Sequence, residues 1–393
     1  MALRAVARAN LAAIERNTER LRRTTAGQAR LCAVVKANGY GHGAAAAGRA
    51  ALQGGATMLG VATAGEAREL RDAGIEAPVL VLGALSAEEL EVALDARGEV
   101  VAWDERFVDE LIAAARAPVA VHVKLDSGMG RYGTRSRQTA LAVAEQVAGT
   151  SARDAGLRLA GAMTHFATAD EDPEFLAVQL TAFEPFAQTL RERAQIVVHA
   201  ANSAATLREP SSHFDMVRCG IALYGCDPFN RDPDAELLEP ALELGSYVAA
   251  VKLARPGESA GYGRRFIAER ETWLATIPIG YGDGVNRALT NNCDILIGGR
   301  RYPMAGTVSM DNITVDVGSE PGVAVGDEAI LIGRSGEERQ TAEQLAHRLQ
   351  TISYEVVCGI SSRVTRAYHR DGAEVPDPGA GPLCDRDGAR VAR

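Results

Sequence analysis

Ala33-Val34-Val35-Lys36-Ala37-Asn38-Gly39-Tyr40-Gly41-His42-Gly43 is a short apolar run, followed by a lysine and three alternate glycines. The β-branched run predicts a buried strand, and the glycines predict a loop. Lys36 is therefore expected at a strand end. Burial lowers the pKa of a lysine because it disfavours the charged form, and a neutral amine can condense with an aldehyde. In most proteins, however, a lysine so placed extends its tip into water.

Lysine is scarce in this chain. Of the 42 Lys and Arg residues, only Lys36, Lys124 and Lys252 are lysines, and all three lie in apolar, strand-like runs. Arginine does not form an imine or a carbamate as an amine does, so lysines kept at such places are candidates for amine chemistry. For Lys252 we expect only a position on a half-buried strand, with the tip of the lysine in solvent.

Composition restricts the class of protein. The chain has 393 residues, 47% hydrophobic and 24% charged, which is typical of a soluble globular protein. A net charge of −9 argues against a nucleic-acid partner, and the lack of a run of about 18 apolar residues argues against a membrane span. The six cysteines form no CxxC pair, so we expect buried thiols in a cytoplasmic protein and no metal site.

Strand-like and helical segments alternate through the first half of the chain. Eight strands followed by helices fit a (β/α)8 barrel, the TIM-like fold, and a doubly wound sheet is the competing interpretation. The predicted strands are residues 31–36, 57–62, 78–82, 99–103, 119–126, 157–164, 195–200 and 216–223.

The pattern changes near residue 237, where short β-rich segments separated by Gly and Asp turns begin. We expect the barrel at residues 11–236 and a second, mainly β domain at 237–370, to which residues 1–10 can add a strand. The tail at 371–393 is rich in Gly, Pro and Asp and is expected to be disordered.

Polar residues gather where the barrel strands end, the face on which barrel enzymes carry their sites. Asn202-Ser203 follows the seventh strand and Gly220-Ile221 lies in the eighth, and loops after these two strands often bind phosphate. Ser203 alone is more often a helix N-cap. A reactive lysine and a phosphate site at one barrel mouth together suggest pyridoxal 5′-phosphate.

The motifs of this chain resemble those of bacterial alanine racemases. The resemblance starts at the Lys36 stretch and includes Lys124-Leu125-Asp126-Ser127-Gly128-Met129-Gly130-Arg131. It continues, in family order, at residues 164–170, 201–205, 216–221, 261–263, 279–281, 308–311 and 352–355. It therefore spans residues 30 to 370 and implies the barrel-plus-β-domain fold of that family.

The resemblance implies a role for each matching residue. Lys36 would bind the cofactor covalently and act as the base on the D face of alanine, and Tyr262 would be the base on the L face. In the family this tyrosine comes from the partner subunit, which implies a homodimer with shared active sites. His165 would support Tyr262, and Arg218 would face the pyridine nitrogen. The product, D-alanine, would supply peptidoglycan synthesis.

The resemblance also implies the binding residues. Arg131 would hold the phenolic oxygen of the cofactor, and Lys124 would position Arg131 as a carbamate. The substrate would meet Met310, Tyr281 and Asp311. The cofactor phosphate would be held by Tyr40, Ser203, Gly220, Ile221 and Tyr354, with Asn202 beside them.

Two departures leave the substrate range open. Gly261 precedes the tyrosine where the family often has a larger residue, and Gly282 stands where alanine is common. Both glycines would loosen the entrance, so a broad-specificity or serine racemase of the same fold is the main alternative. An amino-acid decarboxylase of this architecture would need an acidic residue in place of Arg218. A non-catalytic cofactor-binding barrel would not explain Tyr262.

Overall fold

The computed structural model describes residues 3–25, 29–150, 156–320 and 322–377. By their contacts, the described residues form two compact units. One comprises those within Ile14–Gly39 and Ala44–Leu223. The other comprises those within Met1–Ala13, Tyr40–Gly43 and Tyr224–Asp377. Among the described residues, no helix is long and apolar enough to cross a membrane.

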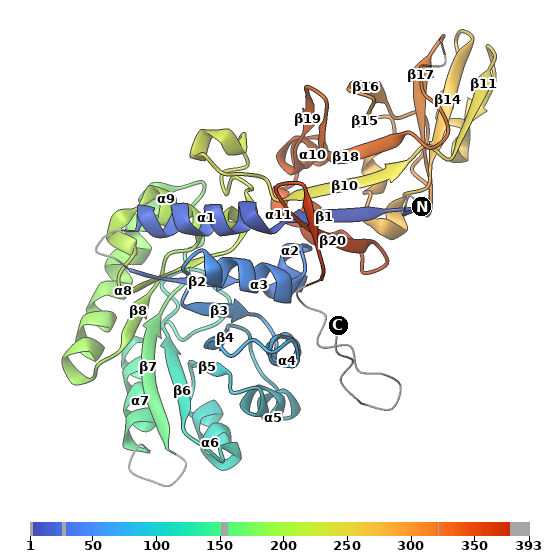
Figure 1. The fold of residues 1–393 in the computed structure, drawn as a ribbon. Coiled ribbons are helices and arrows are strands. Elements are labelled where there is room, and N and C mark those ends of the chain that lie inside the picture. Colours follow the sequence, from blue (N-terminus) through green and yellow to red (C-terminus); the bar gives the residue numbers. More distant parts are fainter. Residues whose placement is uncertain (1–2, 26–28, 151–155, 321, 378–393) are drawn as a thin grey trace, which may run out of the picture. The chain divides into compact units, whose positions relative to one another are not determined.

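The first unit is a closed barrel of parallel strands, β2 to β9 in sequence order (Figure 1). The barrel closes because β9 pairs with β2, for example Arg218 opposite Cys32. This confirms the predicted barrel and excludes the doubly wound sheet. The strands are β2 (Arg30–Val34), β3 (Met58–Val61), β4 (Val79–Val81), β5 (Glu99–Ala102), β6 (Val119–Lys124), β7 (Leu157–Met163), β8 (Val197–His199) and β9 (Met216–Cys219).

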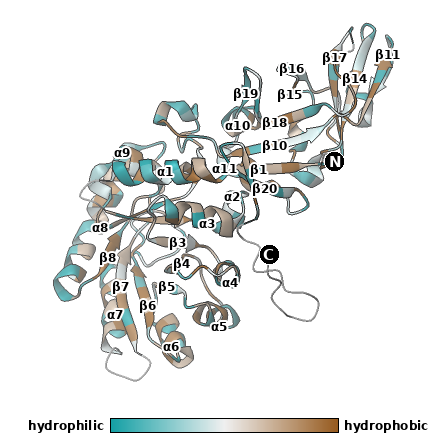
Figure 2. Ribbon diagram, in the orientation of Figure 1, coloured by the Kyte–Doolittle hydropathy of each residue, from teal (hydrophilic) through white to brown (hydrophobic). Residues whose placement is uncertain are grey.

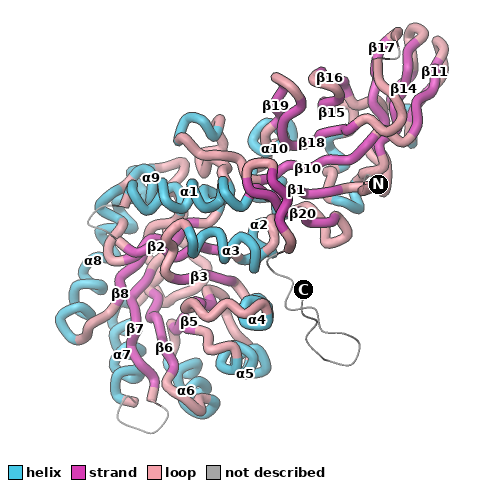
Figure 3. The backbone as a smooth tube through the Cα atoms, in the orientation of Figure 1, coloured by secondary structure: helices cyan, strands magenta, loops and turns pink. Residues whose placement is uncertain are grey.

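Helices alternate with the barrel strands, as the cyan and magenta segments of Figure 3 show. Thr63 and Glu66 form a capping box at the start of α4, and Ser86 and Glu89 do the same for α5, so both starts are encoded locally. The helices are α1 (Leu11–Thr24), α3 (Ala44–Gln53), α4 (Ala64–Asp72), α5 (Ala87–Asp95), α6 (Glu105–Ala114), α7 (Arg137–Gly149), α8 (Pro173–Arg193) and α9 (Ser203–Arg208).

The barrel strands bury almost all of their residues, because each strand faces the interior on one side and helices on the other. Hydrophobic colouring runs along β6, whereas α8 and α9 carry hydrophilic segments (Figure 2). One cluster of side chains from six of the barrel strands fills part of the core: Cys32, Met58, Leu80, Val101, Met163 and Met216.

The second unit is mainly β. Its largest sheet runs β16-β15-β18-β10-β1-β20-β21, with β19 paired to β18, and β11-β14-β17 and β12-β13 form smaller sheets. The strands are β1 (Val6–Asn10), β10 (Leu242–Tyr247), β11 (Ala250–Ala254), β12 (Ser259–Ala260), β13 (Phe266–Ile267), β14 (Thr272–Ile277), β15 (Asp294–Ile297), β16 (Arg300–Pro303), β17 (Ile313–Gly318), β18 (Glu328–Ser335), β19 (Glu338–Gln340), β20 (Thr365–Arg370) and β21 (Ala373–Val375). The helices are α10 (Ala342–Leu349) and α11 (Ser353–Cys358).

The N-terminal residues contribute β1 to this sheet. β1 pairs antiparallel with β10 and parallel with β20. The expectation of a disordered tail from residue 371 is wrong for Ala373–Val375, because β21 pairs with β20. The tail beyond residue 377 lies outside the described residues.

The cysteines divide by burial. Cys32, Cys219, Cys226 and Cys293 are buried free thiols, as expected. Cys358 is exposed, so the expectation is wrong there. Cys384 lies outside the described residues.

Candidate active site

Lys36 follows β2 at the start of a left-handed turn, α2 (Lys36–Tyr40). Ala37, Asn38 and Tyr40 have φ between 51° and 54°, values that non-glycine residues rarely adopt. Side chains hold part of this turn: Ala37 N donates to Glu66 Oε1 at 2.6 Å, and Ala44 N donates to the Asn38 Oδ1 at 3.1 Å. The predicted loop is therefore a strained turn that begins at a half-buried Lys36.

Lys124 ends β6 and is only 3% exposed. Burial, together with the positive charges of Arg218, Arg131 and Lys36, lowers its pKa to about 7 against the opposing effect of Asp126. The ammonium lies 5.7 Å from the centroid of the Tyr132 ring. A substantial fraction of Lys124 is thus a neutral amine at neutral pH.

Asp126 organises the loop that carries Arg131. Its carboxylate accepts hydrogen bonds from Gly128 N and Gly130 N, each at 3.1 Å, and from Arg135 Nε at 3.3 Å. Burial alone raises the pKa of Asp126, but these hydrogen bonds outweigh it and lower the pKa below its usual value. The exposed Arg131 therefore stands on a fixed loop at the end of β6.

Arg218, in β9, is 4% exposed and donates to four acceptors. Nη2 donates to Thr164 O at 2.9 Å, Ala200 O at 3.0 Å and His165 Nδ1 at 3.1 Å, and Nη1 donates to His199 Nδ1 at 3.0 Å. Burial lowers the pKa of Arg218 to about 10, so it stays charged at neutral pH. Burial, together with the charge of Arg218, lowers the pKa of His165 and of His199 well below the usual range, so both imidazoles are neutral.

The residues expected to bind phosphate on the barrel meet at the starts of α9 and of the short helix η3 (Ile221–Tyr224). Ser203 Oγ accepts from Gly220 N at 2.9 Å, and Ile221 is fully buried beside them. The N-cap of α9 is Asn202, whose Oδ1 accepts from Ala205 N at 3.0 Å, so the N-cap interpretation of Ser203 is wrong. The hydroxyl of Ser203 instead joins α9 to Gly220.

The other predicted residues lie in the second unit. Tyr40 stacks on Tyr224 with ring centroids 5.1 Å apart and packs at 6.1 Å against Tyr354. Tyr262, in the short helix η5 (Tyr262–Arg264), is 74% exposed, and its carbonyl accepts from the Thr307 hydroxyl at 2.6 Å. Tyr40 and Tyr354 thus form one aromatic group, whereas Tyr262 presents its ring to solvent.

Tyr281 and Met310 lie on adjacent loops of the second unit. Tyr281, in the short helix η6 (Tyr281–Asp283), donates from its backbone N to Ser309 O, and Gly282 N donates to Met310 O, both at 2.9 Å. Tyr281 is 43% and Met310 51% exposed. Backbone hydrogen bonds therefore join two loops, each of which carries a large exposed side chain.

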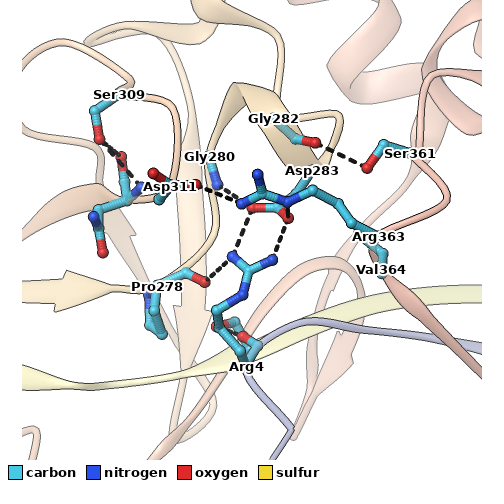
Figure 4. Close-up of polar contacts among 12 residues, drawn as sticks. Arg4, Pro278, Gly280, Gly282, Asp283, Ser309, Asp311, Ser361, Arg363 and Val364 are labelled. Atoms are coloured by element: carbon cyan, nitrogen blue, oxygen red, sulfur yellow. Dashed lines mark hydrogen bonds and ion pairs between the residues drawn. The ribbon is translucent and has the colours of Figure 1, made fainter.

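Asp311 belongs to an ion-pair network beneath these loops, which Figure 4 shows. Arg363 Nη2 donates to Asp311 Oδ1 at 2.5 Å, and Arg363 Nε donates to Asp283 Oδ1 at 2.8 Å. Arg4 forms two further hydrogen bonds to Asp283, which is completely buried. Arg4, Asp283 and Arg363 could not be predicted as a group, since their positions in the sequence give no sign that they meet.

Both glycines that depart from the family pattern have close neighbours. Gly261 has φ +71°, and a Cβ there would lie 3.0 Å from Thr307 N. A Cβ at Gly282 would lie 2.9 Å from Arg363 Nη1 and 3.1 Å from Met310 O. A side chain at either position would therefore meet neighbouring atoms, and the expectation that the glycines widen the entrance stays a prediction.

Two polar residues inside the barrel were also missed. His122 and Glu99 are hydrogen-bonded to each other and, through His199, to Arg218. A lone histidine in the apolar run 119–125 was the available signal. Among the described residues, no group of three or more His, Cys, Asp or Glu side chains is arranged to hold a metal ion.

Comparisons with known proteins agree over nearly the whole chain. The family model described as "Alanine racemase, N-terminal domain" matches residues 9–228, and "Alanine racemase, C-terminal domain" matches residues 241–368. The chain is 43% identical over 372 residues to the alanine racemase of Thermobifida fusca, which covers 93% of this chain and 98% of that one. It is 38% identical over 376 residues to alanine racemase 1 of Bacillus subtilis, with 94% of each chain covered.

Solved structures agree as well. The alanine racemase of D-cycloserine-producing Streptomyces lavendulae has a TM-score of 0.88 and 36% identity, with 94% of this chain and 98% of that chain covered. The alanine racemase of Bacillus anthracis with bound L-Ala-P has a TM-score of 0.86 and 36% identity, covering 95% and 96%. The barrel and the β unit both have their counterparts in these enzymes.

Proposed function

The chain belongs to the alanine racemase family, and we propose that it interconverts L-alanine and D-alanine with pyridoxal 5′-phosphate as its cofactor. The observation that carries the proposal is the arrangement at the carboxyl ends of the barrel strands. A half-buried lysine follows β2, a partly neutral lysine ends β6, and a buried arginine in β9 holds two neutral histidines.

This set of side chains fits the cofactor. Lys36, Lys124, Arg131 and Arg218 are mutually close enough to affect the pKa of Lys124, so the barrel mouth favours an anionic ligand. When bound, pyridoxal phosphate withdraws electrons from the Cα of an attached amino acid and makes its Cα–H acidic. Tyr40, Asn202, Ser203, Gly220, Ile221 and Tyr354 would hold the phosphate.

Racemisation requires a proton to leave one face of Cα and another to arrive on the opposite face. We assign the D face to Lys36 Nζ and the L face to Tyr262 Oη. Two bases suit this task better than one, because a single group would have to move around the substrate between the two steps. The left-handed turn after Lys36 supports the assignment, since backbone strain is concentrated at functional sites.

The hydrogen bonds around Arg218 fit its proposed place opposite the pyridine nitrogen. Arginine has no acceptor and does not readily give up its proton. It would therefore leave that nitrogen unprotonated. His165 accepts from Arg218 at Nδ1, so its proton is on Nε2 and can be donated to the Tyr262 phenol.

Tyr262 supports a homodimer with shared sites. The residue is 74% exposed, and a base used at a buried site is normally covered. We propose that Tyr262 acts in the site of the partner subunit, and that Tyr281, Met310 and Asp311 contact the substrate there. The Met310 backbone N–H would bind the substrate carboxylate, and Tyr281 would narrow the entrance.

The proposal is tested with purified protein, pyridoxal phosphate and L-alanine, by following the enantiomer ratio on a chiral column. Borohydride reduction and peptide mapping should place the cofactor on Lys36, and Lys252→Ala is the matched control because Lys252 is exposed on β11. If no D-alanine forms, or if carbon dioxide is released from another amino acid, the assignment is wrong.

The same assay decides the alternative of a broad-specificity or serine racemase. A Cβ at Gly261 or Gly282 would already meet neighbouring atoms, which supports a small substrate. We expect kcat/KM for L-serine to be well below that for L-alanine. Equal values would support the alternative.

We further propose that the enzyme works in the cytoplasm and supplies D-alanine for peptidoglycan. The buried free thiols Cys32, Cys219, Cys226 and Cys293 suit a reducing compartment. Expression without an export signal should restore growth of a bacterium that requires D-alanine. No growth despite abundant active protein would count against this role.

A further inference from the structure

A continuous hydrogen-bonded chain runs through the barrel interior from Glu99 to Arg218. Glu99 Oε2 lies 2.7 Å from His122 Nε2, His122 Nδ1 lies 2.8 Å from His199 Nε2, and His199 Nδ1 lies 3.0 Å from Arg218 Nη1. His122 and His199 are 1% and 0% exposed. Glu99 is the first residue of β5, whereas His199 ends β8. The hydrogen-bonded chain therefore connects the amino-terminal end of the barrel to the face that carries the site.

The donors and acceptors fix the direction of every bond. Arg218 can only donate, so His199 Nδ1 accepts, and a neutral His199 then carries its proton on Nε2. That proton is donated to His122 Nδ1, which leaves the His122 proton on Nε2. Nε2–H in turn donates to the Glu99 carboxylate. A cationic His122 would force His199 to carry a proton on Nδ1, directly against the Arg218 N–H.

The hydrogen-bonded chain links the buried Arg218 cation to a carboxylate. A buried cation needs a compensating anion or a full set of acceptors, and the acceptors around Arg218 are two neutral histidines and two backbone carbonyls. The carboxylate joined to this group is Glu99, two imidazoles away. Burial alone raises the pKa of Glu99, but the hydrogen bond from His122 lowers it, so the carboxylate is charged at neutral pH.

Gly161 leaves room for His122 in the hydrogen-bonded chain. A Cβ at Gly161, in β7, would lie 2.2 Å from His122 Nδ1. Gly161 is the register partner of His122, and the β6–β7 register shifts at Val121/His122. Gly161 has no left-handed backbone, so the lack of a side chain, and not conformational freedom, is what this position requires.

We propose that Glu99 and His122 are positioning residues for Arg218: the chain they form with His199 holds the guanidinium in place and fixes the protons of His199 and His165 on Nε2. This inference rests on the proposed function, which places Arg218 opposite the cofactor. It adds two residues that lie away from that face of the barrel.

The first test locates the protons of the histidine rings by NMR. Long-range 1H–15N correlation spectra of the 15N-histidine holoenzyme should show His122, His199 and His165 as neutral rings protonated on Nε2 near pH 7. A His199 protonated on Nδ1, or a cationic His122, would overturn the proposal. The spectra do not require turnover. Inactivity toward alanine would therefore contradict the proposed function without affecting the NMR result.

The second test breaks the chain at its remote end. Glu99→Leu removes the acceptor, whereas Glu99→Gln retains an oxygen that can accept from His122. We expect Glu99→Leu to shift the His199 15N resonances and the cofactor absorbance and to lower kcat roughly 10- to 100-fold, as loss of an outer-shell partner does at metal sites. Glu99→Gln should retain the tautomers and most of the activity. Glu76→Leu, at an exposed carboxylate paired with Arg97, is the control.

Gly161→Ala perturbs the same hydrogen-bonded chain without altering an ionisable group. The added methyl group would displace His122, so the His199 resonances should move as in Glu99→Leu. Folding of each variant is checked by its thermal transition. If folded Glu99→Leu and Gly161→Ala both retain wild-type His199 resonances and cofactor absorbance, the proposal is wrong.

Discussion

Asp283 accepts hydrogen bonds from both terminal nitrogens of Arg4, although 279 residues separate them in sequence. The Nη1–Oδ2 and Nη2–Oδ1 distances are 2.9 and 2.5 Å, the bidentate geometry that makes Arg–carboxylate pairs strong. Asp283 also accepts from Arg363 Nε and Gly280 N, at 2.8 and 2.9 Å. One buried carboxylate therefore joins the N-terminal segment to the turn that carries Tyr281.

Asp283→Asn should lower the free energy of unfolding by about 2–4 kcal/mol. Removing one partner of a buried ion pair typically costs about 3–5 kcal/mol, and the partial exposure of both arginines reduces this. Urea unfolding measures the change. Asp311→Asn is the control, because its carboxylate is 54% exposed and should cost less than about 1 kcal/mol. Equal losses in the two variants would contradict the prediction.

The contribution of Asp283 should disappear in acid. Burial alone raises its pKa, but the hydrogen bonds from Arg4 and Gly280 outweigh burial and hold the pKa below 3.8, its ordinary value. A depressed folded-state pKa stabilises the protein above the unfolded-state pKa, and this stabilisation is lost as the pH falls through the folded-state value. The difference in unfolding free energy between wild type and Asp283→Asn should be constant from pH 5 to 7 and shrink below about pH 4. A difference that persists at pH 2 would show that it does not come from the charge.

Lys124 should react with carbon dioxide. Its pKa of about 7 leaves much of the amine neutral at pH 7.5 and most of it protonated at pH 6. With 13C-bicarbonate, 13C NMR should show a carbamate signal that grows as the pH rises through 7. Lys124→Arg should abolish the signal and Lys252→Arg should retain it. A signal that survives in Lys124→Arg would exclude this site.

The barrel could be predicted because its signals are local. Each strand is a short apolar run, and boundaries such as the Thr63–Glu66 capping box are encoded within four residues. The strands of the β unit were harder to predict. Residues 245–253 form one β-rich segment of the sequence, but β10 ends at Tyr247 and β11 begins at Ala250, since the two strands pair in different sheets.

The site was predictable only where a residue type carries its own chemistry. Lysines are scarce, so Lys36 and Lys124 were evident from sequence. Glu99 and Asp283 were not, because their importance depends on partners brought together by the fold. Nothing in the sequence near Gly161 indicates that His122 fills the space beside it.

Tyr262→Phe should affect the two directions of proton exchange unequally. The substitution retains the ring, and the Thr307 hydroxyl still binds the backbone carbonyl of residue 262, so the loop should keep its position. Only the phenolic oxygen is lost. In deuterium oxide, exchange of the Cα proton of L-alanine should fall far more than exchange for D-alanine, as NMR can measure. Equal losses in both directions would weaken the two-base assignment.

Mixing two inactive variants should restore activity if Tyr262 acts in the site of the partner subunit. In a heterodimer of Lys36→Ala and Tyr262→Phe chains, one site then combines a native Lys36 with a native Tyr262, and the other site lacks both. Random reassociation makes half of the dimers heterodimers, each with one working site of two, so activity should return to roughly a quarter of the wild-type value. Each variant alone, unfolded and refolded in the same way, is the control. If Tyr262 instead serves its own chain, every site in the mixture retains one defect, and no activity should appear.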